Sequence, residues 1–321
     1  MPLVHESSYC PPFLLTNGHL QTVYPTLARK LLPDLYQRER IWTPDDDFLD
    51  LDWARIGSGR LAILSHGLEG SSYSHYMIGM ARTLNRHGWD ALAWNYRGCS
   101  GEINRQLRMY HNGSIDDLDC VVRHALKTGR YSTIALIGFS LGGNLTLVYL
   151  GAMKASLDPR VRKAATFSVP CDLPAGAREL AKPKNRFYLQ HFLVSLHDKI
   201  RRKMAVLPGA ISDEGFDQIK TFQDFDDRYT APIHGFRDAE DYWKKCSSAR
   251  FIPEILIPTL IVNALDDPFL AGDCYPVKVA QASRTVHLEM PQKGGHVGFV
   301  QFNHNGTYWS EQRAIAFLEQ E

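Results

Sequence analysis

Short apolar runs alternate with longer amphipathic stretches along most of this chain, and that alternation restricts the fold more than any other feature. The first apolar runs are 61–65 (LAILS), 90–95 (DALAWN) and 133–138 (TIALIG). Helical spacing separates them, over residues 73–87 and 114–127. Strands that alternate with helices predict βαβ units and a mainly parallel sheet that is buried on both faces.

The same patterns continue toward the C-terminus. The later elements expected are a helix over 141–155, strands at 164–169, 259–264 and 285–290, and a final helix over 306–321. The helix at 114–127 opens on Ser114 with Asp117 three residues on, which is typical of a capping box.

The alternation is interrupted between Cys171 and Arg250. This segment is polar, aromatic and helical in pattern, without sheet-like runs. We therefore expect residues 171–250 to form a helical cap over the carboxyl edge of the sheet, where open α/β sheets bind ligands. Residues 41–170 and 251–321 would form the core, and the proline-interrupted residues 1–40 an arm packed on it.

Composition excludes several classes of protein. At 44% apolar and 22% charged residues the chain has an ordinary globular composition. Its net charge is +1, with no basic stripe, so nucleic acid is not an expected partner. The N-terminal residues lack a secretory signal pattern, and no apolar run approaches the roughly 18 residues of a membrane span. The six cysteines are scattered without a CxxC pair, which predicts reduced thiols in a cytoplasmic protein without cofactor or metal.

A glycine-flanked serine lies between an expected strand and an expected helix. Residues 138–142 read GFSLG, the pattern G-x-S-x-G. A strained strand-to-helix turn needs small residues two positions on either side of the serine, because larger side chains would collide. The helix that follows also favours negative charge on a reacting carbonyl. Ser140 is therefore the candidate nucleophile, and a glycine-rich packing turn is the alternative.

A serine nucleophile needs a base, and the base needs an orienting carboxylate. Around such a turn the acid comes first in the chain and the histidine second, each after a later strand. The strand at 259–264 leads into LDDPF. We expect Asp267 to be the acid because these loops typically read Asp-Pro-apolar, and Asp266 is the alternative.

The expected base is His296, which follows the strand at 285–290 in the loop PQKGGH. The two glycines before it give that loop the freedom to fold over the nucleophile. His287 alternates inside the strand, and His304 lies nearer the last helix. Two backbone N–H groups should stabilise the oxyanion: that of Leu141 after the serine, and that of Leu68 in the HGLEG loop after LAILS.

Several other residues are interpreted as structural. Residues 188–204 place apolar side chains on one helical face beside a basic cluster, which fits a cap helix better than a membrane-surface anchor. His66, His75, His111 and His191 are not spaced as metal ligands. The aspartates at 224, 226 and 227 lack the glycine and distal glutamate of a calcium loop, which favours a solvated or cap-anchoring role.

Taken together, these motifs resemble the YheT-like branch (the AB hydrolase 4 family) of the α/β-hydrolases. The segments that carry the resemblance are NGHLQTVYP (17–25), SHGLEGSSYSHY (65–76), NYRGCSGEINR (95–105), YHNGSIDDL (110–118), GFSLGGN (138–144), FDDRYTAPIHGF (225–236) and NALDDPFL (263–270). The resemblance implies an α/β-hydrolase fold and a triad of Ser140, Asp267 and His296. It also implies acyl-ester chemistry, since relatives are described as carboxylesterases, lipases or phospholipases.

The sequence thus predicts a serine carboxylesterase that hydrolyses short- to medium-chain acyl esters, including lipid-derived ones, through an acyl-enzyme. Two alternatives stay open. An acyltransferase would pass the same acyl group to an alcohol, and a non-catalytic protein would only bind a ligand on the same fold.

Overall fold

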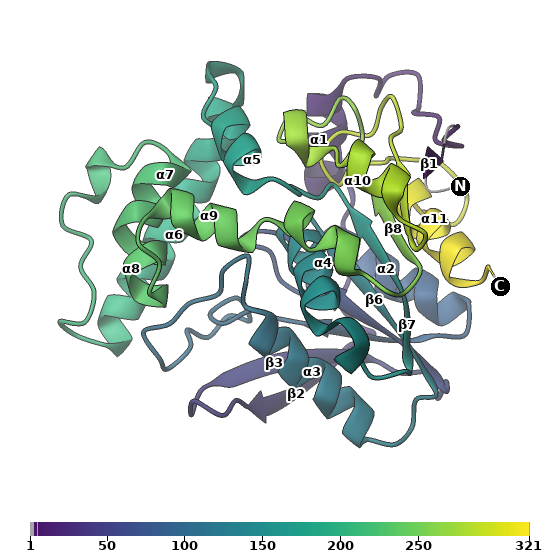
Figure 1. The fold of residues 1–321 in the computed structure, drawn as a ribbon, viewed down its shortest axis with the longest axis horizontal. Helices are drawn as coiled ribbons and strands as arrows, with labels where there is room; N and C mark the ends of the chain where they lie inside the picture. Colours follow the sequence, from purple (N-terminus) through teal and green to yellow (C-terminus); the bar gives the residue numbers. More distant parts are fainter. Residues whose placement is uncertain (1–2, 5, 321) are drawn as a thin grey trace.

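The computed structural model describes residues 3–4 and 6–320 of the chain. The described strands form one nine-stranded sheet in the order β1-β9-β8-β7-β6-β4-β5-β3-β2 (Figure 1). The strands are β1 (Leu3–Val4), β2 (Gln37–Trp42), β3 (Phe48–Ala54), β4 (Arg60–Ser65), β5 (Asp90–Trp94), β6 (Thr133–Phe139), β7 (Val161–Phe167), β8 (Thr259–Val262) and β9 (Val286–Glu289). All neighbouring strands pair in parallel except β3, which is antiparallel to both β2 and β5. The predicted α/β fold is confirmed.

The α-helices are α1 (Gly18–Ala28), α2 (His75–Arg86), α3 (Ile115–Lys127), α4 (Leu141–Met153), α5 (Leu173–Leu180), α6 (Arg186–Val206), α7 (Phe222–Phe225), α8 (Ala231–His234), α9 (Ala239–Cys246), α10 (Val277–Ala282) and α11 (Trp309–Leu318). Helices α5 to α9 lie between β7 and β8 in the chain. Figure 1 shows α6 to α9 grouped at the left, to one side of the sheet.

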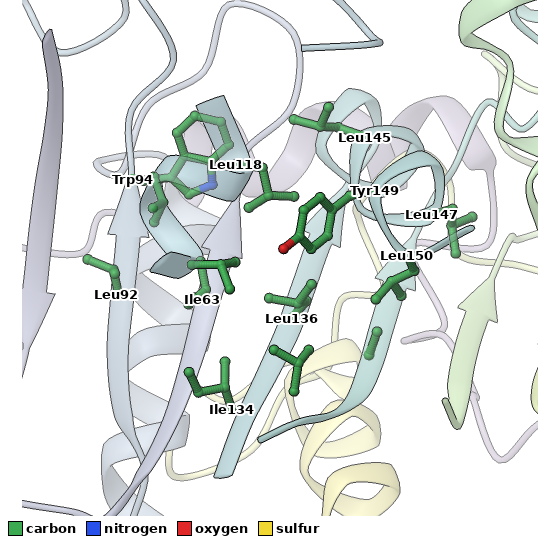
Figure 2. Packing of buried hydrophobic residues seen from close by; sticks show 14 of the residues in the cluster. Ile63, Leu92, Trp94, Leu118, Ile134, Leu136, Leu145, Leu147, Tyr149 and Leu150 are labelled. Atoms are coloured by element: carbon green, nitrogen blue, oxygen red, sulfur yellow. The ribbon is translucent and has the colours of Figure 1, made fainter. Parts of the chain in front are cut away.

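Two apolar cores cover the two faces of the sheet. Ile63 and Leu92 pack toward Leu118 of α3 and Tyr149 of α4 (Figure 2). Leu64, which follows Ile63 in β4, points the other way, into a second core with α2 and α11. Because successive side chains on a strand alternate between faces, a sheet covered on both sides needs near-continuous apolar strands. This requirement explains the runs LAILS and TIALIG.

The antiparallel hairpin of β2 and β3 was not expected from the sequence. Its strands carry charges that conceal the apolar pattern. Arg40 lies directly opposite Asp50, and Arg38 opposite Asp52. Each arginine makes two hydrogen bonds to its partner, at 2.7–2.9 Å. Cross-strand ion pairs of this kind stabilise a sheet through contacts that strand propensity does not reveal.

The start of α3 also differs from expectation. Ser114 makes no side-chain cap to the helix, and its Oγ accepts the His111 amide at 3.0 Å instead. Asp117 does not close a capping box, because both its oxygens face the buried Arg97 guanidinium at 2.8–3.2 Å. Arg97 also pairs with Asp47 at 2.9 Å and Asp45 at 2.8 Å. One buried cation therefore joins the β2–β3 turn, the loop after β5 and α3.

Replacement of Arg97 should destabilise the fold strongly. In Arg97→Met the carboxylates of Asp47 and Asp117 stay buried without a cation, which costs about 3–5 kcal/mol of the free energy of unfolding. Urea titration followed by circular dichroism measures it. The exposed pair of Arg178 with Glu240 supplies a matched control, since Arg178→Met should leave the midpoint nearly unchanged. Equal midpoints for the two variants would contradict the structural role of Arg97.

Candidate active site

Ser140 occupies a strained turn between β6 and α4. Its φ is 53°, in the left-handed region that non-glycine residues rarely adopt. The Ser140 amide donates to the Phe167 carbonyl of β7 at 2.9 Å, which ties the turn to the neighbouring strand. A strained backbone of this kind persists only where surrounding contacts enforce it, and residues with such strain cluster at functional sites.

The flanking glycines are required by close backbone approaches. A Cβ on Gly142 would lie 2.5 Å from the His66 carbonyl oxygen, and one on Gly138 would lie 2.7 Å from Cα of Gly143. Neither approach leaves space for a side chain. The two glycines therefore let α4 begin directly against the loop that follows β4.

The side chain of His296 lies between Ser140 and Asp267. Its Nε2 is 2.9 Å from Ser140 Oγ, and its Nδ1 is 2.9 Å from Asp267 Oδ2 and 3.1 Å from Oδ1. The Asp267 side chain is fully buried, and the Phe269 amide donates to its Oδ1 at 2.8 Å. The ring of Phe269 packs against the imidazole, with centroids 4.1 Å apart. The imidazole is thus held in an orientation that can accept the Ser140 proton.

The other residues that the sequence offered as acid or base make different contacts. Asp266 accepts the Gly295 amide at 3.0 Å through Oδ1, so it shapes the histidine loop. His287 lies on β9 with its ring 5.8 Å from that of Phe317. His304 lies in an exposed loop before α11. It is His296 whose ring reaches Ser140 Oγ, and it is Asp267 that holds that ring.

The N-terminal helix α1 packs on the loops that carry the acid and the base, a role that the sequence did not predict. Thr22 Oγ1 accepts the His296 amide at 2.9 Å. A Cβ on Gly18 would lie 3.0 Å from the Asp266 carbonyl carbon, and one on Gly295 would lie 2.7 Å from Cβ of Gln21. The segment NGHLQTVYP contains Gly18, Gln21 and Thr22, and was the one signal of this contact.

The loop after β4 passes over the N-terminus of α4. The Gly67 amide donates to Tyr76 Oη and the Glu69 amide to Tyr110 Oη, each at 2.9 Å. Between them, the Leu68 amide has no hydrogen-bond partner within residues 3–4 and 6–320. Leu141 is the first residue of α4, where backbone N–H groups are left without intrahelical partners. These two amides are the ones that the sequence suggested for an oxyanion.

Two cavities meet at Ser140 and His296. The inner cavity, of about 140 Å³, lies under α5 to α9 and is mostly apolar, with Leu173, Leu180 and Phe192 in its walls. The outer groove is wider and lies between α1 and α6, beside Thr26 and Tyr188. A substrate bound across the serine would have one part in each.

One wall of the inner cavity is polar but carries little charge. Burial lowers the pKa of His111 well below its ordinary value and that of His234 to about 4. Burial also raises the pKa of Asp226 to about 7, although Thr230 and Trp243 donate hydrogen bonds to it at 2.5 and 2.7 Å. Asp226 belongs to a π-helical turn, Asp226–Thr230, and its bond to Trp243 ties that turn to α9.

The aspartate cluster at 224, 226 and 227 serves the helices around it. Asp224 caps α7, and Asp227 accepts the Ala239 amide at 2.6 Å at the start of α9. In the part of the chain that the structure describes, no group of three or more His, Cys, Asp or Glu side chains could hold a metal ion.

Comparison with known proteins gives the family. A model of the α/β-hydrolase fold family matches residues 63–302. The chain belongs to the α/β-hydrolase family. Among curated α/β-hydrolases, it is 34% identical to the putative esterase YheT of Escherichia coli, over 92% of this chain and 88% of that protein. The resemblance stated from the sequence motifs is therefore confirmed.

Other relatives carry lipase names. This α/β-hydrolase is 28% identical to mouse phospholipase ABHD3, over 94% of this chain and 75% of that protein. It is also 28% identical to a monoacylglycerol lipase of Saccharomyces cerevisiae, over 92% of this chain and 66% of that one. Its structure resembles an esterase of Pyrococcus furiosus, with a TM-score of 0.59 at 18% identity over 90% and 94% of the two chains. None of the described helices is both long and apolar enough to cross a bilayer.

The two neighbouring aspartates give a matched pair of variants. Asp267→Asn should lower kcat for ester hydrolysis by about 10³-fold or more, because the neutral asparagine amide cannot stabilise the charged imidazole as the carboxylate does. Asp266→Asn keeps an oxygen for the Gly295 amide and should lower kcat less than about tenfold. Steady-state kinetics at pH 7–8 measure both. Equal losses in the two variants would contradict the different roles of these carboxylates.

The raised pKa of Asp226 predicts a pH-dependent stability. The folded state holds the Asp226 proton more tightly than the unfolded state does. The contribution of this group to the free energy of unfolding is therefore fully present below the ordinary pKa of 3.8, and it is lost as the pH rises through about 7. Asp226→Asn should therefore flatten the fall in Tm between pH 5 and pH 8. Thermal denaturation across that range tests it, and an unchanged slope would contradict the burial of this carboxyl.

Proposed function

We propose that this α/β-hydrolase is a serine carboxylesterase that cleaves short- to medium-chain acyl esters. The observation that carries the proposal is the continuous line of hydrogen bonds from Asp267 through His296 to Ser140 Oγ, at the mouth of an apolar cavity. Nucleophile, base and orienting acid in this order form the arrangement that activates a serine hydroxyl.

In the acylation step Ser140 Oγ attacks the ester carbonyl while His296 Nε2 takes the hydroxyl proton. Asp267 holds Nδ1–H and stabilises the imidazolium that forms. The Leu68 and Leu141 amides donate to the oxyanion of the tetrahedral intermediate. As the intermediate collapses, the C–O bond to the alcohol breaks and His296 returns the proton to the departing oxygen.

Deacylation repeats the same steps with water. His296 takes a proton from water as its oxygen attacks the acyl carbon, and the oxyanion again lies at Leu68 and Leu141. The bond to Ser140 Oγ then breaks, and His296 gives the proton back to that oxygen. A carboxylic acid leaves, and the enzyme is ready for another ester.

The cavities indicate how the ester binds. We place the acyl chain in the inner cavity and the alcohol in the outer groove, so that residues 171–250 act as the substrate cap over the core. An apolar cavity of ~150 Å³ accommodates a molecule the size of benzene, so 140 Å³ favours a short acyl chain. The phospholipase and lipase relatives support lipid-derived esters among the small-molecule substrates. The six free cysteines fit a reducing compartment, and we propose the cytoplasm.

An acyltransferase is a second candidate, because the outer groove offers room for an acceptor alcohol beside Ser140. The two activities share the acyl-enzyme and differ only in what attacks it. Product analysis with added alcohol separates them, since a transferase forms the new ester in preference to the free acid even when water is in large excess.

Hydrolysis of p-nitrophenyl esters tests the proposal. We expect kcat/KM to be highest for butyrate to octanoate and to fall for palmitate, because the inner cavity is short. Ser140→Ala should lose at least about 10³-fold in kcat. A fluorophosphonate probe should label the wild type and not the variant. Undiminished turnover in Ser140→Ala would contradict the assignment of the nucleophile, and an unlabelled wild type would favour a non-catalytic binding protein.

A further inference from the structure

A buried ion pair connects the cap segment to the loop that carries Leu68. Lys199 of α6 and Glu69 lie 2.7 Å apart, from Nζ to Oε1, with their side chains only 6% and 10% exposed. Lys199 Nζ also donates to Cys99 Sγ at 3.0 Å and lies 4.6 Å from the centroid of the Tyr110 ring. A cation enclosed in this way is retained by its partners, because an unpaired buried charge is costly.

Tyr110 completes the connection to the backbone. Its hydroxyl donates to Glu69 Oε1 at 2.6 Å and accepts the Glu69 amide at 2.9 Å. The Tyr110 ring stacks on that of Tyr96, and Tyr96 Oη donates to the His66 carbonyl at 2.7 Å. The Tyr110 hydroxyl thus bridges the side chain and the backbone amide of Glu69, and the Tyr96 hydroxyl holds the other end of the loop at His66.

These contacts enforce an unfavourable backbone conformation. Glu69 has φ of 53°, the left-handed region in which a side chain is strained. Leu68 and Glu69 are the two central residues of a turn that the Gly70 amide closes on the Gly67 carbonyl at 3.1 Å. The Leu68 N–H belongs to the first peptide of that turn, so its direction depends on the turn keeping its shape. Loss of the contacts to the Glu69 carboxylate would let this residue return to a common conformation and turn the Leu68 amide away from the oxyanion.

The charges agree with this arrangement. Burial alone would lower the pKa of Lys199, yet its hydrogen bond to Cys99 Sγ and the Glu69 carboxylate hold it above its ordinary value. Burial also raises the pKa of the Cys99 thiol to about 11, so that the thiol is neutral and accepts from the ammonium. At the start of the loop, burial lowers the pKa of His66 to about 3. The neutral imidazole can then accept the Tyr96 amide through Nε2 and donate to the Gly67 carbonyl through Nδ1.

We propose that Lys199, Glu69 and Tyr110 are positioning residues that hold the Leu68 amide for the oxyanion and so couple the seating of cap helix α6 to catalysis. The same helix places Phe192 and Leu196 in the wall of the inner cavity. The pair of Lys199 and Glu69 therefore connects this wall of the cavity to the oxyanion loop. This inference rests on the proposed function, because it assigns a role within the same site.

Lys203 supplies a matched control one turn further along α6. It is fully buried and donates to the Asn104 carbonyl and side chain and to the Gln106 carbonyl, at 2.6–2.7 Å. It thus ties α6 to the core without touching the loop of Leu68. Lys199→Met and Lys203→Met remove the same charge from the same helix, and they differ in whether the oxyanion loop loses a contact.

Two inhibitors separate positioning from packing. An alkyl trifluoromethyl ketone forms a tetrahedral oxyanion on Ser140, whereas the corresponding secondary alcohol only fills the cavities. We expect Lys199→Met to weaken the ketone about tenfold or more and to lower kcat by a similar factor, with KM and the alcohol affinity nearly unchanged. Lys203→Met should leave the ratio of the two affinities at its wild-type value. Tyr110→Phe keeps the stacked ring, removes only the hydroxyl and should follow Lys199→Met.

The outcomes distinguish this inference from the proposed function. A wild type that binds the ketone no better than the alcohol contradicts the proposed function, and the inference falls with it. A wild type that prefers the ketone, with the preference intact in both Lys199→Met and Tyr110→Phe, contradicts the inference alone. Equal weakening of ketone and alcohol in Lys199→Met also contradicts it, because the lysine would then act through cavity packing. Lys199 lines the inner cavity, so the alcohol measures that contribution.

Discussion

The close approach of α4 to the loop after β4 is the constraint on which the site depends. Gly142 lies so near the His66 carbonyl that no side chain fits between them. Because the two backbones are in contact, this approach fixes the N-terminus of α4 and Ser140 relative to the Leu68 loop. The strained φ values of Ser140 and Glu69 are the local cost of this geometry, and the two apolar cores and the buried contacts around Tyr96 and Tyr110 supply the stability that offsets it.

Much of the fold could be predicted because its local signals agree with its long-range packing. The runs LAILS and TIALIG are almost continuously apolar because both faces of the sheet are covered. The order of Ser140, Asp267 and His296 along the chain also located the loops that the structure brings together, since parallel strands deliver their carboxyl ends to one edge. Choosing Asp267 over Asp266 depended on one proline, and in the structure only Asp267 contacts the imidazole.

The features that the sequence could not indicate depend on contacts between residues that are far apart in the chain. The strands of the β2–β3 hairpin are hard to recognise in the sequence because they carry charged residues, which pair across the sheet. The contact of Thr22 with His296 spans 274 positions, and that of Lys199 with Cys99 spans 100. The basic cluster on α6 was interpreted as part of a cap helix, and the sequence did not indicate that Lys199 and Lys203 are buried against the core. Side-chain charge alone does not say whether a lysine faces water or a carboxylate.

The central claim is that Ser140 carries the acyl group during turnover. The most direct measurement is rapid quenching of the reaction with a p-nitrophenyl ester, followed by mass spectrometry of proteolytic peptides. We predict an acyl adduct on the peptide that contains Ser140, formed as fast as p-nitrophenol in the initial burst. An adduct on another residue, or a burst without an adduct on Ser140, would contradict this account of the site.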